Sequence, residues 1–495
     1  MGSASSSKCT TGVPGLDDIL CGGLPTNSIY LVDGNPGVGK TTLALQFLNE
    51  GVRNKERCLY VTLSETKPEL EAVAQSHGWS LAGIDVIELS AIERALVGKG
   101  QNTMFQSAEI ELNQLSKLLL EEIDRVRPTR IVLDSLSEMR LLAQSPLRYR
   151  RQILTFKQQF AERNSTVLLL DDRSAVGPDV QVQSIVHGMI SLFTAQVKYG
   201  GMRRFLTVTK LRGVKYREGN HDYLIKRGGL HIYPRLVAAE HHTPFQKTIY
   251  SGGNAGLDAL LGGGLHGGTS NLLIGPAGSG KSTIATMFAR TAAVRGQQVS
   301  YYAFDENTHL LRDRARELGL DLEPHVTSGH LRLTQLDPAQ TSPGELAYEI
   351  LRSVEQNKVK VVVLDSLNGY VSAMPNEEFL NLHLHELLTY LNQQGVMTLM
   401  ILAQHGLLGP MGAPVDISYL ADTVILTRYF EALGAVRKAI SVIKKRSGAH
   451  ETTIRELKMS PEGISVGSPL AEFEGVLTGV PHYFGSRRNI LGEND

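Results

Sequence analysis

Two short segments of the chain have the residue types and the spacing of a phosphate-binding loop. Gly34–Thr41 and Gly275–Ser282 both fit the pattern G-x-x-x-x-G-K-[ST]. In such a loop the glycines let backbone N–H groups converge on phosphates, the lysine neutralises the terminal phosphates, and the last hydroxyl ligates Mg²⁺. The sequence therefore predicts two sites for ATP and Mg²⁺.

Each loop stands between an apolar segment and a helical pattern. The first lies between residues 28–32 and 42–50, and the second between residues 271–274 and 284–290. A strand, a loop and a helix in this order point the helix N-terminus at an anion. The residues predicted to bind the nucleotide are Gly37, Val38, Gly39, Lys40, Thr41 and Thr42 in the first copy and Gly278, Ser279, Gly280, Lys281, Ser282 and Thr283 in the second, with Thr41 and Ser282 also predicted to ligate the metal.

Acidic residues follow the next predicted strand in both copies, Glu65 in the first and Asp305 with Glu306 in the second. Glu306 follows Glu65 by 241 positions (306 − 65), the same separation as Lys281 from Lys40 (281 − 40). A loop acid is usually only solvated, but a carboxylate at a strand end can orient the nucleophile that attacks a γ-phosphate, and the matching separation favours this role. Because the second copy has two carboxylates, one could serve Mg²⁺, and we expect the two sites to differ in rate or reaction.

Two further aspartates end apolar segments, Asp134 in Val132–Leu136 and Asp365 in Val363–Leu367. A carboxylate there can hold a Mg²⁺-bound water near the loop hydroxyl. The alternative is an aspartate that caps the next helix. We predict Asp134 and Asp365, together with Asp305, as metal-binding residues.

Near the end of each copy lies a Lys-x-Arg pair, Lys210 with Arg212 and Lys444 with Arg446. Strand alternation places both members of a pair on one face. Such cations could reach the γ-phosphate bound by a neighbouring subunit, as arginine fingers do, whereas a basic pair is otherwise most often a solvated surface.

The repeated order of these parts predicts a tandem duplication of an α/β domain, in which each parallel sheet is covered by helices on both faces. We predict a disordered N-terminus at residues 1–9, a first domain at 10–234, a linker at 235–247, a second domain at 248–478 and a C-terminal tail at 479–495. The pattern predicts strands at 58–63, 130–134 and 166–170 and helices at 67–77, 110–126 and 148–163 in the first copy. In the second copy it predicts strands at 299–304, 359–364 and 397–402 and helices at 310–318, 343–356 and 377–394.

The composition restricts the class of protein. The chain has 495 residues, 42% of them hydrophobic, with 50 basic and 50 acidic side chains. This size suits two domains. The balanced net charge disfavours nucleic-acid binding, although it does not exclude a local basic channel. No apolar run reaches the length of a membrane span, so we expect a cytoplasmic protein without a membrane partner.

The residues described above, with Thr11–Asp17 before the first loop and Lys210–Gly213 near the end of the first copy, resemble the KaiC family of tandem RecA-like ATPases. The resemblance covers residues 10–478. It implies ATP-dependent homohexamers with nucleotide held between subunits, an ATPase in the first domain and an autokinase in the second. By its motifs it assigns catalysis to Glu65, Asp305 and Glu306, and contact with the neighbour's nucleotide to the two Lys-x-Arg pairs.

The same resemblance places a phosphoacceptor at Ser418. The family's circadian member has an adjacent Ser-Thr pair, and here the second position is Tyr419. The resemblance also implies regulatory partners, either KaiB-like proteins or a histidine-kinase pathway. Two other function classes stay open from the sequence: a RecA- or DnaB-like DNA-dependent ATPase, which would need a basic, aromatic channel, and an assembly module that uses ATP only to join subunits.

Overall fold

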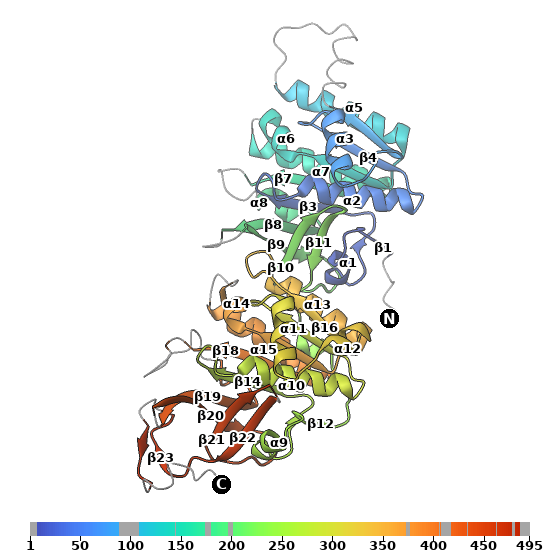
Figure 1. Cartoon of the computed structure of the whole chain (residues 1–495). Helices are drawn as coiled ribbons and strands as arrows, with labels where there is room; N and C mark the ends of the chain where they lie inside the picture. Colours follow the sequence, from blue (N-terminus) through green and yellow to red (C-terminus); the bar gives the residue numbers. More distant parts are fainter. Residues whose placement is uncertain are drawn as a thin grey trace. The chain divides into compact units, whose positions relative to one another are not determined.

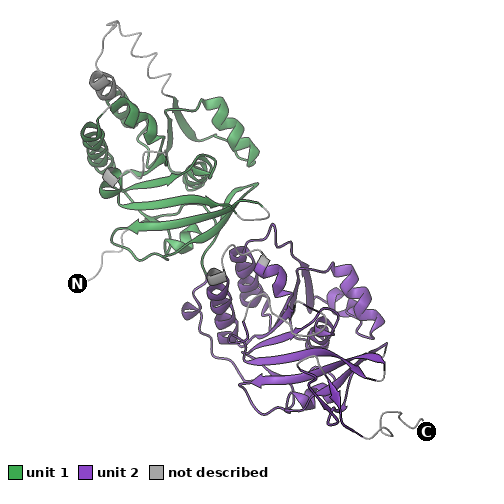
Figure 2. Ribbon diagram, turned by 90° about the vertical axis from the view of Figure 1, so that its left-hand side faces the viewer, with its two compact units in different colours: residues 1–197, 201–235 green, residues 198–200, 236–495 purple. Residues whose placement is uncertain are grey.

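The chain divides into two compact units, with the division between Arg235 and Leu236 (Figure 2). The computed structural model describes residues 7–88, 108–143, 145–173, 180–196, 201–372, 377–404, 406, 417–432, 434–461, 463–477 and 481–485. Each unit contains one nine-stranded sheet with helices packed against it (Figure 1). The predicted fold class, two tandem α/β domains with mainly parallel sheets flanked by helices, is confirmed.

The sheet of the first unit has the order β11-β10-β9-β8-β3-β7-β6-β4-β5. The strands from β8 to β5 are parallel to one another, and β9, β10 and β11 continue the sheet in antiparallel fashion. The strands are β3 (Ile29–Gly34), β4 (Cys58–Thr62), β5 (Ile84–Glu88), β6 (Arg130–Asp134), β7 (Thr166–Asp172), β8 (Gly188–Ala195), β9 (Arg203–Leu211), β10 (His221–Lys226) and β11 (Gly229–Tyr233), with a small pair β1 (Lys8–Cys9) and β2 (Leu24–Pro25). The helices are α1 (Leu16–Ile19), α2 (Lys40–Arg53), α3 (Lys67–Ser76), α5 (Ala108–Val126), α6 (Leu136–Ala143), α7 (Pro146–Glu162) and α8 (Val180–Ile185).

The second unit repeats this topology strand for strand, with the order β16-β15-β17-β18-β14-β19-β20-β21-β22. Its strands are β14 (Ser270–Gly275), β15 (Val299–Ala303), β16 (Leu331–Gln335), β17 (Val361–Asp365), β18 (Met397–Ala403), β19 (Thr423–Ala432), β20 (Ala435–Lys445), β21 (Arg455–Ser460) and β22 (Gly463–Pro469), with the small pairs β12 (Ile249–Tyr250) and β13 (Leu265–His266), and β23 (Phe473–Glu474) and β24 (His482–Tyr483). Its helices are η1 (Ala238–Glu240), α9 (Ala255–Leu260), α10 (Lys281–Val294), α11 (Thr308–Glu317), α12 (Glu323–Thr327), α13 (Pro343–Asn357), α14 (Leu367–Ser372) and α15 (Glu377–Gln393).

The apolar runs of the central strands supply two core layers in each unit, because successive side chains of a strand point to opposite faces. In β3, Tyr30 and Val32 pack into the layer that contains α1 and α2, while Ile29 and Leu31 pack into the layer that contains α6 and α7. The second unit has the same arrangement around β14, where Leu273 and Leu272 belong to opposite layers. This double cover explains why the parallel strands are almost continuously hydrophobic.

The strands and helices predicted from periodicity are all present, with boundaries within two residues of the prediction except at the two loop helices. There α2 extends three residues beyond the predicted 42–50, and α10 extends three and four residues beyond the two ends of 284–290. The edge strands β5 and β16 and most of the antiparallel strands were not predicted, since they are partly exposed and interrupted by charged residues, as strands near a sheet edge often are. No helix in the described ranges has the length and apolar character needed to cross a bilayer.

Apart from Arg235, which belongs to the first unit, the predicted linker at residues 235–247 is part of the second unit. Leu236 and Ala238 are buried in the layer that contains α15. The Ala238 N–H donates to Glu386 Oε2 at 2.9 Å, and Gln394 Nε2 donates to the carbonyl of His241. The backbone of this segment therefore makes hydrogen bonds to side chains of α15 and of Gln394, the residue after it.

Order begins closer to the N-terminus than predicted, because Lys8 and Cys9 form β1. In the predicted C-terminal tail, His482 and Tyr483 form β24. The remainder of the predicted disordered N-terminus, residues 1–6, and residues 479–480 and 486–495 of the predicted tail lie outside the described residues.

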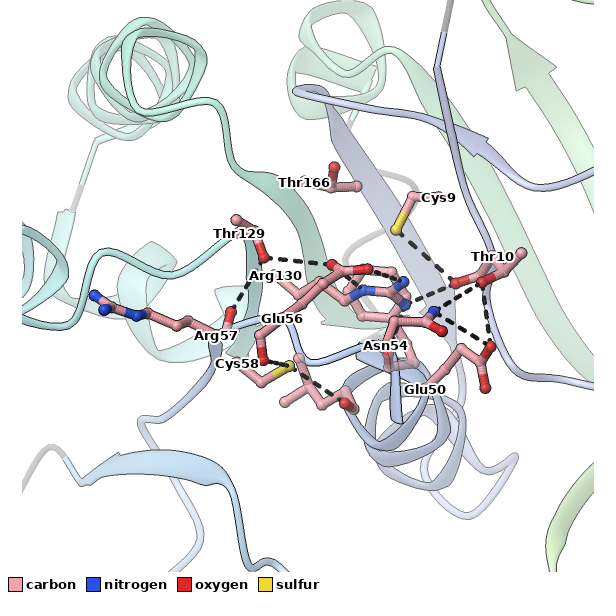
Figure 3. A network of polar contacts seen from close by, with 12 residues as sticks. Cys9, Thr10, Glu50, Asn54, Glu56, Arg57, Cys58, Thr129, Arg130 and Thr166 are labelled. Atoms are coloured by element: carbon pink, nitrogen blue, oxygen red, sulfur yellow. Dashed lines mark hydrogen bonds and ion pairs between the residues drawn. The ribbon is translucent and has the colours of Figure 1, made fainter. Parts of the chain in front are cut away.

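A buried arginine joins several elements of the first unit (Figure 3). Arg130 of β6 is 1% exposed, and its guanidinium binds both carboxylate oxygens of Glu56 at 2.8 and 2.9 Å. It also donates to the carbonyls of Thr10 and Phe47 at 2.7 and 2.9 Å and lies 4.8 Å from the centroid of the Phe47 ring. The charge is thus paired and hydrogen-bonded, as a buried charge must be. The matching residue in the second unit is Val361, the first residue of β17.

His221 of β10 is a fully buried histidine, and it gives the first unit a pH-dependent stability. Its Nδ1 accepts from the Arg235 N–H at 2.8 Å, so its Nε2 carries the proton and donates to the Arg217 carbonyl at 3.1 Å. Burial lowers the pKa of His221 to about 4. The unfolded chain binds a proton below pH 6.5 whereas the folded chain does so only near pH 4, so the free energy of unfolding decreases as the pH is lowered through this window.

We expect this histidine alone to remove about 3 kcal/mol of stability between pH 7 and pH 4. The measurement is urea unfolding followed by fluorescence of Trp79, the only tryptophan of the chain, which reports the first unit. His221→Gln keeps a donor and an acceptor but cannot titrate, so its pH dependence should be weaker. An identical pH dependence in both proteins would contradict the expectation.

Candidate active sites

The two phosphate-binding loops connect β3 to α2 and β14 to α10, and both helices begin at the motif lysine. Gly37 and Gly39 have φ values of 81° and 98°, and Gly278 and Gly280 have 74° and 102°. Residues with a Cβ rarely adopt this left-handed conformation, so the glycines are required by the path of the loop. The loops therefore have the backbone form that the motif predicts.

Lys40 lies against the backbone of its own loop. It is 8% exposed and donates to the carbonyls of Gly34 and Asn35 at 2.9 and 3.1 Å. It also forms an ion pair with Asp172, 2.6 Å from Nζ to Oδ1. Asp172 ends β7 directly beside Gly34 in the sheet. A phosphate group can replace these contacts of the ammonium group.

Lys281 has a different environment. It is 5% exposed and donates to the Pro276 carbonyl at 2.6 Å. The residue beside Gly275 is Ala403, where the first unit has Asp172. Burial lowers the pKa of Lys281 to about 8, an effect that Asp365 partly opposes. The second loop thus holds its lysine without the carboxylate found in the first.

The other loop residues face the protein. Val38, Thr42, Ser279 and Thr283 are buried. Ser279 Oγ donates to the Pro276 carbonyl at 2.8 Å and lies 2.7 Å from Thr427 Oγ1. These residues can therefore bind a phosphate through their backbone N–H groups rather than through their side chains.

Asp134 contacts the loop of the first unit. The Thr41 hydroxyl donates to Asp134 Oδ2 at 3.2 Å, and the buried hydroxyl of Tyr60 donates to the same oxygen at 2.5 Å. Burial raises the pKa of Asp134, and both hydrogen bonds lower it. The carboxylate is therefore directed at the loop, as predicted for a residue that holds Mg²⁺.

Asp365 has the same surroundings in the second unit. The Tyr301 hydroxyl donates to its Oδ2 at 2.6 Å. Burial raises the pKa of Asp365, while hydrogen bonds from Tyr301 and Ser282 lower it. The two tyrosines were not singled out from the sequence, although each lies three residues into the strand before the acids and their spacing could have indicated them.

Glu65 lies beyond the end of β4 with a free carboxylate oxygen. Its Oε2 is buried without a hydrogen-bond partner in the described part of the chain. Its backbone is fixed by Thr62, whose Oγ1 donates to the Glu65 carbonyl at 2.7 Å. Burial, followed by the charges of Asp134, Glu69 and Asp172, raises the pKa of Glu65. Such a carboxylate is suited to accept a proton from water.

The acid pair of the second unit is held differently. Ser366 Oγ donates to Asp305 Oδ2, and Glu306 Oε2 forms a 2.9 Å ion pair with Arg314 of α11. Burial raises the pKa of Glu306, and Arg314 lowers it. At the position of Arg314 the first unit has Val73, 241 residues earlier (314 − 73). Comparison of the two copies could have found this cation, which makes the surroundings of Glu306 different from those of Glu65.

The Lys-x-Arg pairs lie near the amino-terminal ends of the parallel strands, opposite the carboxyl-terminal ends from which the phosphate-binding loops start. Lys210 Nζ donates to the Gln183 carbonyl at 2.6 Å, and Arg212 Nη2 donates to the Ser184 carbonyl at 2.8 Å. The Arg212 N–H bonds to the carbonyl of His187, which precedes β8, whereas the loop begins where β3 ends. The two ends of β3 are five residues apart, a distance of about 16 Å along the strand. The pair is therefore far from the loop of its own unit.

The second pair repeats this geometry. Lys444 Nζ donates to the carbonyls of Ser418 and Ala421 at 3.2 and 2.7 Å, and Arg446 Nη2 donates to the Tyr419 carbonyl at 3.3 Å. Ser418 is half-buried in the turn before β19. It therefore also lies away from the loop of its own unit.

The residues around each loop fit a nucleotide with Mg²⁺. A hydroxyl and a carboxylate converge in each unit, and hard oxygen ligands of this kind suit Mg²⁺, which takes further ligands from phosphates and water. No cluster of three or more His, Cys, Asp or Glu side chains that could hold a metal alone occurs within the described ranges. The bound phosphates would therefore have to complete the coordination.

Comparison with known proteins decides the family. The KaiC ATPase family model matches residues 9–237 and again residues 251–471. The chain belongs to the KaiC ATPase family. It is 26% identical to the circadian clock protein KaiC3 of Synechocystis sp., across 96% of this chain and 95% of that protein. It is 26% identical to the circadian clock oscillator protein KaiC of Synechococcus elongatus, across 96% and 92% of the two chains, and 25% identical to that of Acaryochloris marina, across 96% and 91%.

Membership of the KaiC family confirms the resemblance read from the motifs and makes the two units RecA-like ATPase domains that bind nucleotide. The two matches correspond to the two compact units.

Proposed function

We propose that this KaiC-family protein hydrolyses MgATP in both units, as a homohexamer, and that the second unit also transfers phosphate to Ser418. The observation that carries the proposal is the recurrence in both units of one constellation: a motif hydroxyl beside an aspartate that accepts a hydrogen bond from a buried tyrosine, with a glutamate beyond the strand that carries the tyrosine. Phosphoryl transfer needs these positioning and electrostatic elements and little else.

In this proposal Lys40 and Lys281 bind the terminal phosphates, and Thr41 with Asp134 and Ser282 with Asp365 hold Mg²⁺. The metal, when bound, neutralises charge on the phosphates. Glu65 accepts a proton from the attacking water through its free, buried Oε2. In the second unit Glu306 has the corresponding role, and Asp305 is available to the metal.

The position of the Lys-x-Arg pairs supports an assembly in which subunits share their nucleotide sites, and the number of six subunits is what the family resemblance implies. Each pair is about 16 Å along the strands from the loop of its own unit, so it cannot serve that nucleotide. A cation at this edge can reach a nucleotide only on another subunit, which is the arrangement of an arginine finger supplied in trans. Lys210 with Arg212 and Lys444 with Arg446 would each contact the γ-phosphate of a neighbour.

The autokinase role rests on Ser418, which lies in the turn contacted by Lys444. If Lys444 reaches a neighbour's γ-phosphate, this turn lies beside the same phosphate, and the serine hydroxyl can attack it. The new bond joins Ser418 Oγ to the γ-phosphorus, the bond between that phosphorus and the bridging oxygen breaks so that ADP leaves, and Glu306 or Asp305 of the neighbouring subunit takes the hydroxyl proton. We further propose a regulatory or signalling role in the cytoplasm, with KaiB-like or histidine-kinase-pathway partners and no function on DNA.

The test uses γ-labelled ATP and Mg²⁺ with the wild type, Lys40→Ala, Lys281→Ala and Ser418→Ala. Released phosphate and label on the protein are measured together. We expect both single lysine variants to retain partial hydrolysis, and label to disappear in Lys281→Ala and Ser418→Ala only. Label that persists in Ser418→Ala would contradict the phosphoacceptor, and absence of phosphate release from the wild type would contradict the ATPase.

A further inference from the structure

A hydrogen bond from a buried tyrosine to the aspartate beside the loop hydroxyl occurs in both units. Tyr301 follows Tyr60 by 241 positions (301 − 60), which is also the separation of the two motif lysines. The Tyr60 hydroxyl donates to Asp134 Oδ2 at 2.5 Å, and the Tyr301 hydroxyl donates to Asp365 Oδ2 at 2.6 Å. A contact that recurs at the same atoms of both copies points to a role in what the copies have in common, their nucleotide sites.

The register of the sheet brings each tyrosine to its aspartate. Tyr60 of β4 pairs with Val132 of β6, and Thr62 pairs with Asp134, so the tyrosine and the aspartate are two positions apart along the strands. Because residues two apart in a strand share a face, both side chains lie on the face covered by α2, the helix that begins at the loop. The second unit repeats this register between β15 and β17, on the face covered by α10.

Packing alone does not require the two hydroxyl groups. Tyr60 and Tyr301 are 0% and 1% exposed, and a phenylalanine would fill the same space without a buried group that needs a hydrogen-bond partner. Tyr30 of β3 belongs to the same core layer as Tyr60, yet its hydroxyl donates to the backbone carbonyl of Pro25 at 2.6 Å. A tyrosine of this layer can therefore be satisfied away from the site, so the contact with the aspartate is a feature of the site itself.

The aspartate in turn orients the motif hydroxyl. Asp134 Oδ2 also accepts from the Thr41 hydroxyl at 3.2 Å, and Ser282 makes a hydrogen bond to Asp365 in the second unit. A hydroxyl group has one proton and two lone pairs, so a proton directed at the aspartate leaves the lone pairs for a cation. Because the tyrosine holds Oδ2, the carboxylate cannot turn away from the motif hydroxyl without breaking a charge-assisted hydrogen bond.

We propose that Tyr60 and Tyr301 are positioning residues for the metal: each fixes the aspartate that orients the motif hydroxyl, and thereby raises the affinity of its site for Mg²⁺. The inference rests on the proposed binding of MgATP by the two loops. The tyrosines act through the aspartates and are not metal ligands themselves. Residues that orient a metal ligand from outside typically change metal affinity by about 10- to 100-fold.

The experiment measures binding of mant-AMPPNP, a fluorescent non-hydrolysable ATP analogue, to the full chain as the free Mg²⁺ concentration is varied, and again in EDTA. Lys281→Ala is present throughout, so that only the first loop binds nucleotide. Tyr60→Phe is compared with Tyr30→Phe, the matched control, which removes a tyrosine hydroxyl from the same core layer but outside the site. Urea unfolding followed by Trp79 fluorescence checks that the first unit is folded.

We expect Tyr60→Phe to raise the free Mg²⁺ concentration for half-maximal nucleotide binding by about 10- to 100-fold, while binding in EDTA is unchanged and the control behaves as the parent does. In an Asp134→Asn background the same substitution should have little effect, since the tyrosine acts through the carboxylate. A tyrosine that only stabilises the fold would have the same effect whether this position is aspartate or asparagine.

The second site gives an independent test. In a Lys40→Ala background, Tyr301→Phe should raise the Mg²⁺ requirement in the same way, whereas Tyr302→Phe, at a residue that packs in the opposite core layer, should not. If the parent binds the nucleotide in a Mg²⁺-dependent manner but a tyrosine variant needs no more Mg²⁺ than its control, the inference is wrong for that unit and the proposed MgATP binding stands. If nucleotide binding by the parent does not respond to Mg²⁺, the proposed function fails and the inference fails with it.

Discussion

Replacing Glu65 by glutamine is expected to lower hydrolysis at the first site by about 10²–10⁴-fold while MgATP still binds. Glutamine keeps the size and hydrogen-bonding capacity of the side chain but cannot accept a proton. The buried Oε2 of Glu65 has no partner within the described ranges, and burial together with neighbouring acids raises the pKa of the carboxyl group. A general base is most effective when its pKa lies near the working pH. The raised pKa brings Glu65 closer to this condition than a solvated carboxyl group would be.

The measurement is phosphate release in a Lys281→Ala background, which removes the contribution of the second loop, together with the affinity for a fluorescent ATP analogue. Glu71→Gln on α3 (Lys67–Ser76), the helix that follows Glu65, is the matched control, because it removes a carboxylate outside the constellation around Asp134. Glu65→Gln with an unchanged rate would show that the proton acceptor lies elsewhere. Loss of nucleotide binding would show instead that Glu65 holds the metal or the loop.

Replacing Arg130 by valine is expected to cost the first unit about 3–5 kcal/mol, because it leaves Glu56 without its partner inside the protein. The guanidinium makes four hydrogen bonds that join β6 to Glu56, to α2 and to the N-terminal segment at Thr10 (Figure 3). Valine is the residue at the matching position of the second unit, Val361, so the size and shape are compatible with the fold.

The double variant Glu56→Gln with Arg130→Val copies Gln297 and Val361 and removes both charges. We expect it to be more stable than either single variant, since neither charge is then left unpaired. Urea unfolding followed by Trp79 fluorescence measures the first unit in the full chain, and ellipticity reports both units together. If the effects of the two single changes simply add, the pair is not coupled and the expectation is wrong.

The difference between the two active sites arises from residues outside the motifs. Asp172 pairs with Lys40 where the second unit has Ala403, and Arg314 pairs with Glu306 where the first unit has Val73. The group whose charge is neutralised therefore differs between the units. It is the loop lysine in the first unit and the glutamate in the second. The expectation that the sites differ thus gains a physical basis, although the direction of any difference in rate stays a prediction.

The sequence by itself determined the duplication, the two loops, the acids at matching separations and the order of most strands and helices. It could do so because these features are local: a loop that binds phosphate needs glycines at fixed positions, and a buried parallel strand needs a continuous apolar run. The family resemblance rested on the same motifs, and the comparisons confirmed it.

The tertiary structure alone decided which residues from different elements meet. The ion pairs of Lys40 with Asp172 and of Glu306 with Arg314 and the tyrosines that bind Asp134 and Asp365 join residues of different elements. Their spacing carries no local signal, since the register of the sheet and the packing of the helices on it bring them together. The packing of residues 236–247 on α15 also came only from the structure, because a polar segment looks the same in sequence whether its hydrogen bonds go to water or to a helix.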